Sequence, residues 1–559
     1  MKVTAAPTAD RSAARGRRPG CTSVSDIGAT LGRISDYDQG RGRAGPYADR
    51  VSEPTESDVD AGPDATASTT TAPLASWAAA ALVFGSSAAV LVVELVALRL
   101  LAPYLGLTLE TNTLVIGVAL AAIAFGSWVG GWWADRVDPR RVLAPLLGVS
   151  AVVVAATPFL VRGSADAADG ALLLLVAAAT IIVPGALLSA VTPMVIKLML
   201  ASLSETGTIV GRLSGIGTVG AIFGTVVTGF ILISRLSVSW IMVGLGLALL
   251  LAAVVVGLRI GRTPARTVAA GTGAALLLGA ATVVFPSGCD TETIYHCVTV
   301  DADPERPDGR LLVMDGLRHS YVDLEDPTHL EFDYVRAIAA GIDARFEDGA
   351  PLTVHSIGAG GLTLPRHLDA DRPGTTGSVS EVDPGVIRVD REALALPESL
   401  DLDIRVEDGR LGLQTLPAGE VDVVIGDAFG GVSVPWHLTT REASLEIDRT
   451  LADNGIYLLN LIDYGPLAFA RAELATLRDS YPHVALAWSG RGGNLVAAAS
   501  RAPIDVPSWQ SRLDARDVAW SVLAGEGLDD WIGDSPVLTD DFAPVDQLLT
   551  PYPSGAAAG

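Results

Sequence analysis

The feature that most constrains this chain is a succession of long apolar runs between Ser76 and Phe285. Seven runs can be counted, near 77–103, 112–134, 142–161, 171–200, 208–234, 238–258 and 267–285. Each has roughly the 20 residues that a helix needs to cross the hydrocarbon core of a bilayer. The mean hydropathy of +0.41 is high for a soluble enzyme. We therefore predict a transmembrane domain of about seven helices over residues 74–285.

Small residues and prolines add detail to these helices. Glycine pairs at 126–130, 211–215 and 220–224 place small residues on one helix face, which predicts close helix packing. Pro184 and Pro193 interrupt the fourth run. They predict either a kink or a helix that dips into the membrane and returns.

Arginine and lysine in the short loops predict an orientation. They lie at Arg136, Arg140, Arg141, Lys197, Arg212, Arg259, Arg262 and Arg266. Under the positive-inside rule these loops and the N-terminal tail are cytoplasmic, so seven spans place the chain after Phe285 on the extracytoplasmic side. A re-entrant fourth run would instead return it to the cytoplasm. Cys289 and Cys297 follow the last run, and whether they pair depends on this compartment.

Two ionisable residues lie inside the first run. Glu94 and Arg99 are costly there unless they are paired or near the interface. Arg99 lies near the end of the run and can extend to the interface as a structural anchor. A substrate pathway is the alternative.

The remaining segments differ in composition. Residues 1–73 have few large apolar side chains and predict a disordered tail without a signal peptide. A small β region and a linking helix are predicted over 286–340, an α/β domain over 341–550, and a short tail over 551–559. The formal net charge of −24 argues against nucleic acid as a partner.

A strand, glycine turn, helix and second strand organise the α/β domain. Val354–Gly361 ends in glycines, 362–368 has room for a helix, and Ser378–Asp383 ends in carboxylates. Asp408 and Asp427 follow at later strand ends. In a Rossmann-like sheet the glycines admit a nucleoside and an acid accepts its ribose hydroxyls. We therefore predict a nucleoside pocket at one sheet edge.

These motifs resemble those of the polyamine aminopropyltransferases, the spermidine synthase family, in the bacterial form that is fused to membrane spans. The resemblance covers about residues 76–550. It is carried by Ile357–Arg366, Glu381–Asp383, Glu407–Gly409, Gly426–Phe429, Asp315–Gly316, Phe332–Tyr334 and the segment 539–546.

The resemblance implies decarboxylated S-adenosylmethionine as co-substrate, a polyamine such as putrescine as acceptor, and no metal. Asp427 would orient or deprotonate the attacking amine with help from Tyr334, Glu381 would bind the ribose, and Asp408 the adenine amino group. The implied cofactor-binding set is Gly358, Gly360, Glu381, Asp383, Asp408 and Gly409, and the implied substrate-binding residues are His319 and Asp427. For each acid there is a structural alternative, in which the side chain is only a solvated group at the end of a strand.

Two positions depart from the family pattern. Gly361 and Gly430 stand where family members carry aspartates that recognise amines. The acceptor and turnover itself are therefore open. The alternatives are another S-adenosylmethionine-type transferase, or a membrane transporter or sensor that binds a nucleoside or polyamine without turnover. Assembly into a homo-oligomer is also left open.

Overall fold

The computed structural model describes residues 74–105, 109–167, 170–200, 206–259, 273, 288–430 and 434–550. Three sequence predictions fall on other residues. The N-terminal tail of 1–73, the seventh apolar run near 267–285 (Gly273 excepted) and the tail of 551–559 lie outside the described residues and stay predictions.

The apolar part of the chain is helical. Within the described residues, six helices are long and apolar enough to cross a membrane. The elements are α1 (Ser76–Leu105), α2 (Leu109–Ala134), α3 (Pro139–Ala167), α4 (Gly170–Ser189), α5 (Val191–Met199), α6 (Thr206–Val227), the π-helical turn η4 (Thr228–Leu232) and α7 (Val238–Arg259). The fourth run is interrupted at Ala190, just before Pro193, and α4 and α5 together form one candidate span. The first six predicted runs thus correspond to observed helices.

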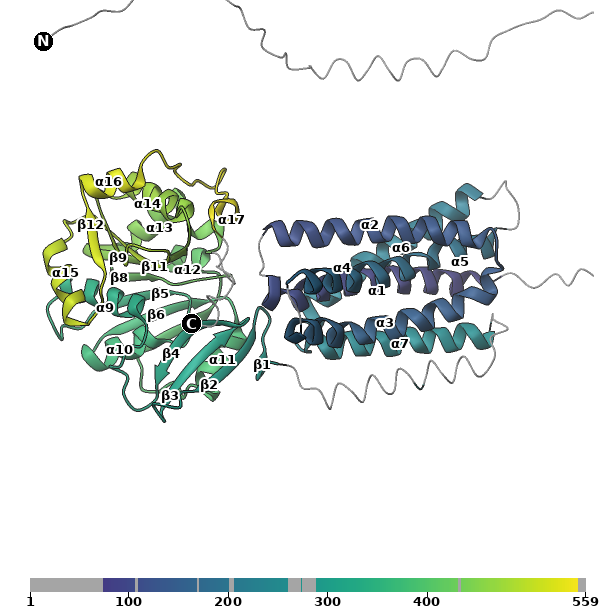
Figure 1. Ribbon diagram of the computed structural model, residues 1–559, viewed down its shortest axis with the longest axis horizontal. Helices are drawn as coiled ribbons and strands as arrows, with labels where there is room; N and C mark the ends of the chain where they lie inside the picture. Colours follow the sequence, from purple (N-terminus) through teal and green to yellow (C-terminus); the bar gives the residue numbers. More distant parts are fainter. Residues whose placement is uncertain are drawn as a thin grey trace, which may run out of the picture. The chain divides into compact units, whose positions relative to one another are not determined.

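Glycines set how closely these helices approach. A side chain on Gly126 or Gly130 would collide with the backbone of α4 and Ala190, and one on Gly220 or Gly224 with the backbone of α1. Accordingly α2 packs on α4 and α1 on α6, while α3 runs beside α7 (Figure 1). The pair Gly211 and Gly215 has no neighbour of this kind among the described residues. Two of the three small-residue motifs therefore mark close contacts.

A four-stranded antiparallel sheet follows, with the order β1-β2-β3-β4. Its strands are β1 (Thr291–Glu292), β2 (Cys297–Ala302), β3 (Gly309–Met314) and β4 (Leu317–Asp323). Asp315 and Gly316 join β3 to β4 with φ of 53° and 77°, the two left-handed residues that a tight hairpin turn requires. Cys289 and Cys297 form a disulfide with their Cα atoms 5.3 Å apart.

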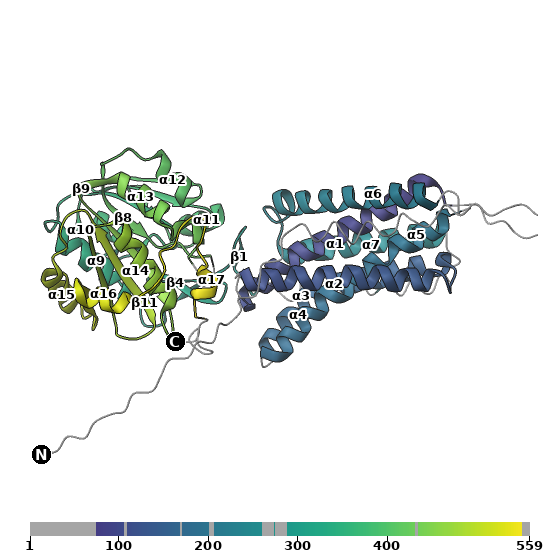
Figure 2. The same cartoon turned by 90° about the horizontal axis from the view of Figure 1, so that it is seen from above.

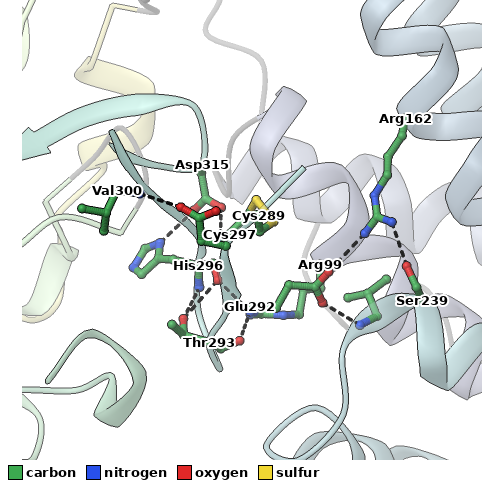
Figure 3. Close-up of a disulfide and its surroundings, with 12 residues drawn as sticks. Arg99, Arg162, Ser239, Cys289, Glu292, Thr293, His296, Cys297, Val300 and Asp315 are labelled. Carbon is green, nitrogen blue, oxygen red and sulfur yellow. Dashed lines mark hydrogen bonds and ion pairs between the residues drawn. A yellow bond between two sulfur atoms is a disulfide. The ribbon is translucent and has the colours of Figure 1, made fainter. Parts of the chain in front are cut away.

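The start of this sheet contacts the helices (Figure 3). Glu292 in β1 pairs with Arg162 of α3 at 3.1 Å and accepts a hydrogen bond from Val238 N at the start of α7 at 2.7 Å. The guanidinium of Arg99 donates to the carbonyls of Thr293 and Ile294. Arg99 therefore has the contacts of a structural anchor.

The larger sheet has eight strands in the order β12-β10-β11-β9-β8-β5-β6-β7. They are β5 (Thr353–Ile357), β6 (Thr376–Glu381), β7 (Leu402–Val406), β8 (Val421–Gly426), β9 (Leu451–Asp463), β10 (His483–Trp488), β11 (Gly493–Ser500) and β12 (Ser521–Ala524). β5 to β9 are parallel, whereas β10, β11 and β12 extend the sheet with antiparallel pairs.

Helices cover both faces of this sheet (Figures 1 and 2). Alternate residues of β8 point to opposite faces, since Val423 packs with Trp509 in one core and Val424 with Phe469 in the other. The helices of the domain are α9 (Asp333–Arg345), α10 (Thr363–Asp371), α11 (Pro384–Glu392), α12 (Gly409–Thr415), η5 (Trp436–Leu438), α13 (Arg441–Thr450), α14 (Ala468–Ser480), α15 (Val506–Ala515), α16 (Glu526–Ile532) and α17 (Val545–Leu548).

The strand order fixes where a ligand can bind. β5 is paired with β6 on one side and β8 on the other. The strand order therefore reverses at β5, with β6 and β7 on one side and β8 and β9 on the other. Ligands of open α/β sheets bind at such a switch point, beyond the carboxyl ends of the strands. The fold is thus a helical bundle followed by a Rossmann-like α/β domain with a small β region before it, as predicted.

Candidate functional site

The glycine turn after β5 brings two strand ends together. Gly358 has a φ of +95° and Gly360 a φ of +50°, conformations that favour glycine. A Cβ on Gly358 would lie 2.5 Å from the carbonyl oxygen of Asp427. The turn therefore lies directly against the end of β8.

Glu381 is the last residue of β6 and is fixed by the backbone. Its Oε2 accepts a hydrogen bond from Ala359 N at 2.9 Å, and its Oε1 accepts one from Asp383 N at 2.8 Å. Burial raises the pKa of Glu381, and these two backbone hydrogen bonds oppose that shift. The carboxyl group is held beside the glycine turn, with one further lone pair on each oxygen for a ligand.

Asp383 takes a different place. It is fully buried, caps α11 by accepting from Gly385 N at 2.8 Å, and accepts a hydrogen bond from the hydroxyl of Thr293. It does not line the cavity described below. Its geometry is that of a group that joins α11 to the β1–β2 segment.

Asp408 begins α12 and faces a histidine. Its Oδ1 accepts from Arg410 N at 3.0 Å and from Leu411 N at 3.2 Å, which caps the helix. Its Oδ2 lies 2.9 Å from Nε2 of His437. A Cβ on the neighbouring Gly409 would collide with Ile357, so the start of α12 packs tightly on β5.

Asp427 follows β8 and lies at the centre of a hydrogen-bonded group. Tyr334 Oη donates to its Oδ2 at 3.2 Å and Asn460 Nδ2 donates to its Oδ1 at 2.8 Å. Asn494 Nδ2 in turn donates to Asn460 Oδ1 at 3.0 Å. Burial raises the pKa of Asp427 to about 6, while the hydrogen bonds from Asn460 and Tyr334 lower it. A carboxylate poised near neutral pH can act as a base.

Tyr334 and His319 complete this part of the site. Burial and the charge of Asp427 raise the pKa of Tyr334, which keeps its hydroxyl protonated as a donor. That hydroxyl also lies 3.3 Å from the carbonyl oxygen of His319. Burial lowers the pKa of His319 to about 4, so its ring is neutral. Its Nε2 is buried without a hydrogen-bond partner among the described residues.

One cavity of about 1050 Å³ brings these residues together, which is ample for a nucleoside with a side chain. Every predicted site residue except Asp383 lines it, namely Gly358, Gly360, Glu381, Asp408, Gly409, Asp427, Tyr334 and His319. Among the described residues no group of three or more His, Cys, Asp or Glu side chains is placed to hold a metal ion.

Sequence reasoning missed several residues of the cavity. Tyr295 and His296 enter it from the segment between β1 and β2, and His296 Nδ1 lies 2.7 Å from Asp315 Oδ2. His437 enters from η5. For Asn460 a signal existed, because it is a polar residue inside an apolar strand. The others have no comparable sequence signal.

Comparisons with known proteins find similarities for both halves of the chain. The family model of the Major Facilitator Superfamily matches residues 68–296. A polyamine aminopropyltransferase of Chromobacterium violaceum is 28% identical over 141 residues, which is 25% of this chain and 53% of the relative. Another, of Vibrio vulnificus, is 28% identical over 149 residues, 26% of this chain and 49% of the relative. The chain spans about half the length of the curated relatives it matches.

Solved structures of spermidine synthases are also among the similar proteins. A probable spermidine synthase from Corynebacterium glutamicum is 26% identical, with a TM-score of 0.43, and the match covers 46% of this chain and 97% of that one. A spermidine synthase in complex with the transition-state analogue AdoDATO is 16% identical, with a TM-score of 0.30, covering 48% and 84%. The resemblance predicted from the sequence motifs is confirmed: in its α/β domain the chain is similar to polyamine aminopropyltransferases, and its helical region is similar to the Major Facilitator Superfamily.

Proposed function

We propose that this protein is a membrane-anchored aminopropyltransferase-like enzyme, which moves a propylamine group from decarboxylated S-adenosylmethionine to an amine. One observation carries the proposal. A buried carboxyl group, Asp427, receives hydrogen bonds from Tyr334 and Asn460 in the same cavity as Glu381 and Asp408. In this proposal a base and a nucleoside site share one pocket.

The residues of the nucleoside end fit such a ligand. Gly358 and Gly360 let the backbone approach it closely, Glu381 accepts hydrogen bonds from ribose hydroxyls, and Asp408 accepts one from the adenine amino group. Asp383 supports this end from outside the cavity by capping α11.

Asp427 supplies the chemistry at the other end. It holds the acceptor amine in line with the carbon next to the sulfonium and accepts the proton that the amine loses on forming the new bond. Tyr334 donates to Asp427 and fixes its orientation. The sulfonium is already an activated leaving group, so positioning and proton transfer are the tasks left to the protein.

We also propose a side of the membrane. The basic loop between α2 and α3 is cytoplasmic by the positive-inside rule, and a seventh span near 267–285 would place the α/β domain outside. The disulfide between Cys289 and Cys297 supports this, because such bonds persist in oxidising compartments.

The test is methylthioadenosine release by the purified full-length chain, supplied with decarboxylated S-adenosylmethionine and amine acceptors. Asp427→Asn is expected to lower the rate at least about 100-fold. Asp453→Asn, whose side chain is fully exposed in the same domain, is the matched control and keeps the rate. No release by correctly folded protein with any acceptor would refute the proposal.

A second candidate is favoured by the match of residues 68–296 to the Major Facilitator Superfamily. In it the α/β domain binds a nucleoside or polyamine without turnover and serves a transporter or sensor. Uptake of radiolabelled polyamine into vesicles that persists in Asp427→Asn would support this candidate over the enzyme.

A further inference from the structure

One end of the cavity surrounds Asp427 and is built from separate parts of the chain. This acceptor end comprises Arg318, Phe332, Asn460, Tyr464, Arg491 and Asn494. Asn460 donates to Asp427 and receives a hydrogen bond from Asn494. Tyr334, which also donates to Asp427, stacks on Phe332 with ring centroids 6.0 Å apart. A molecule held at this end therefore lies next to Asp427.

The acceptor end carries two guanidinium groups. Arg318 of β4 lies over the ring of Phe332, 5.2 Å from its centroid. Arg491 lies in the turn between β10 and β11, where its backbone groups bond to Ser489. Its guanidinium has no hydrogen-bond or ion-pair partner among the described residues. The guanidinium group of an arginine in a cavity wall can bind a carboxylate by donating two parallel hydrogen bonds to its oxygens.

The acids of this region already have partners. Glu331 Oε2 lies 3.2 Å from His329 Nε2, and Asp333 Oδ1 lies 3.5 Å from Arg336 Nη1. Both are also well exposed to solvent, with 39% and 53% of the side chain accessible. Asp427 is required for the amine that reacts. Among the described residues that line the cavity, Glu331 and Asp333 thus contact a histidine and an arginine, whereas Arg491 faces no acid.

The glycine turn has no room for an additional acid. A Cβ on Gly361 would lie 2.9 Å from Val322 Cγ2 and 3.0 Å from Ser320 Cβ. Gly361 N also donates to Ser320 Oγ at 3.0 Å. β4 thus fills the space in which a side chain at position 361 would stand. The shortage of acids follows from how β4 packs on the turn.

We infer that the acceptor is a primary amine whose far end carries a carboxylate, as in an ω-amino acid, and that Arg491 holds this carboxylate. The inference rests on the proposed aminopropyl transfer. The amine nitrogen forms a bond to the methylene carbon next to the sulfonium while the carbon–sulfur bond breaks. Its electron pair leaves with sulfur as the thioether methylthioadenosine, and the proton of the amine passes to Asp427. The product is an N-(3-aminopropyl) amino acid.

Charge explains the preference. The guanidinium group of Arg491 attracts a carboxylate and repels an ammonium group at the same position, so both effects favour the amino acid over the diamine. We expect a difference of at least about tenfold in kcat/KM between acceptors that are matched in length.

The experiment compares matched pairs with the full-length chain. Putrescine and 4-aminobutyrate both have four carbons, and the carboxylate of 4-aminobutyrate stands where putrescine has its second primary amine. Pairs with three, five and six carbons extend the series. Methylthioadenosine release with decarboxylated S-adenosylmethionine gives kcat/KM, and calorimetric titration in the presence of methylthioadenosine gives the acceptor Kd. We expect the amino acid to be preferred in both. Release that favours the diamines overturns this inference but keeps the proposed function, and release with neither class overturns both.

A charge reversal provides the second readout. Arg491→Glu is expected to shift the Kd ratio at least about tenfold towards the diamine. Arg405→Glu is the matched control, because Arg405 lies in the edge strand β7, is paired with Asp403, and does not line the cavity. Its ratio should equal that of the unmodified chain. An unchanged ratio in Arg491→Glu overturns the assignment.

Discussion

At the scale of single residues, Asp427 predicts how activity depends on pH. Burial raises its pKa to about 6, and only its ionised form accepts the proton of the amine. Activity is therefore expected above pH 6, with kcat falling about tenfold per pH unit below it. The rate of methylthioadenosine release between pH 5 and 8, at saturating acceptor, measures this decrease in kcat.

The variant Tyr334→Phe tests whether the fall in activity below pH 6 comes from protonation of Asp427. The hydrogen bond from Tyr334 lowers the pKa of Asp427, so its removal should move the inflection to higher pH. Tyr464→Phe serves as the control for a lost hydroxyl, because Tyr464 lines the same cavity but is not among the groups that shift the pKa of Asp427. A rate that stays constant from pH 7 to pH 5 would contradict the role of Asp427.

Sequence reasoning predicted three acids that line the cavity but not their partners. Glu381, Asp408 and Asp427 follow strand ends, and the parallel sheet brings strand ends to one edge. His437 meets Asp408 across 29 residues and Asn460 meets Asp427 across 33. Such pairings depend on the packed fold. For Asp383 the motif predicted contact with a cofactor and did not reveal that the side chain caps α11.

At the scale of elements, the disulfide stabilises a wall of the cavity. Cys297 begins β2, and its N–H donates to Asp315 Oδ1 at 2.9 Å, while Asp315 also bonds to His296 in the cavity wall. Closing a loop of this length contributes about 2–3 kcal/mol in the chain-entropy model. Replacing Cys289 and Cys297 by serine is therefore expected to speed amide exchange in residues 291–298 by roughly 30- to 150-fold.

Hydrogen–deuterium exchange of the full-length chain measures this effect. Cys21→Ser is the control for loss of a sulfur atom, because Cys21 is the third cysteine and lies outside the described residues. Unchanged exchange at 291–298 in the double serine variant would show that hydrogen bonds alone hold the segment.

Elements with a strong local pattern were predictable. The glycine turn, the strands beside it and the apolar helices follow from spacing and from runs of apolar residues. The break between α4 and α5 lies at Ala190, just before Pro193, which supplies no backbone N–H. The packing partners were not predictable, since Gly211 and Gly215 have the same spacing as Gly220 and Gly224 but meet no neighbour among the described residues. Spacing shows where close approach is allowed, and the rest of the bundle decides where it occurs.

At the scale of the whole molecule, topology decides which compartment supplies the substrates. Six candidate spans precede a segment outside the described residues, near 267–285, and one further crossing there would reverse the side of the α/β domain. The positive charges between α2 and α3 predict a cytoplasmic position for that loop. The disulfide of the β region is consistent with an oxidising compartment on the other side.

Labelling of single cysteines in intact cells tests this arrangement. In a Cys21→Ser background, Glu305→Cys places a thiol in the exposed loop between β2 and β3, and Val137→Cys places one in the turn between α2 and α3. We expect a membrane-impermeant maleimide to label Glu305→Cys in intact cells and Val137→Cys only after the membrane is permeabilised. The two thiols control for each other, because both become reactive once the membrane is open. If Glu305→Cys stays unlabelled until then, the α/β domain is cytoplasmic and the chain crosses the membrane an even number of times before it.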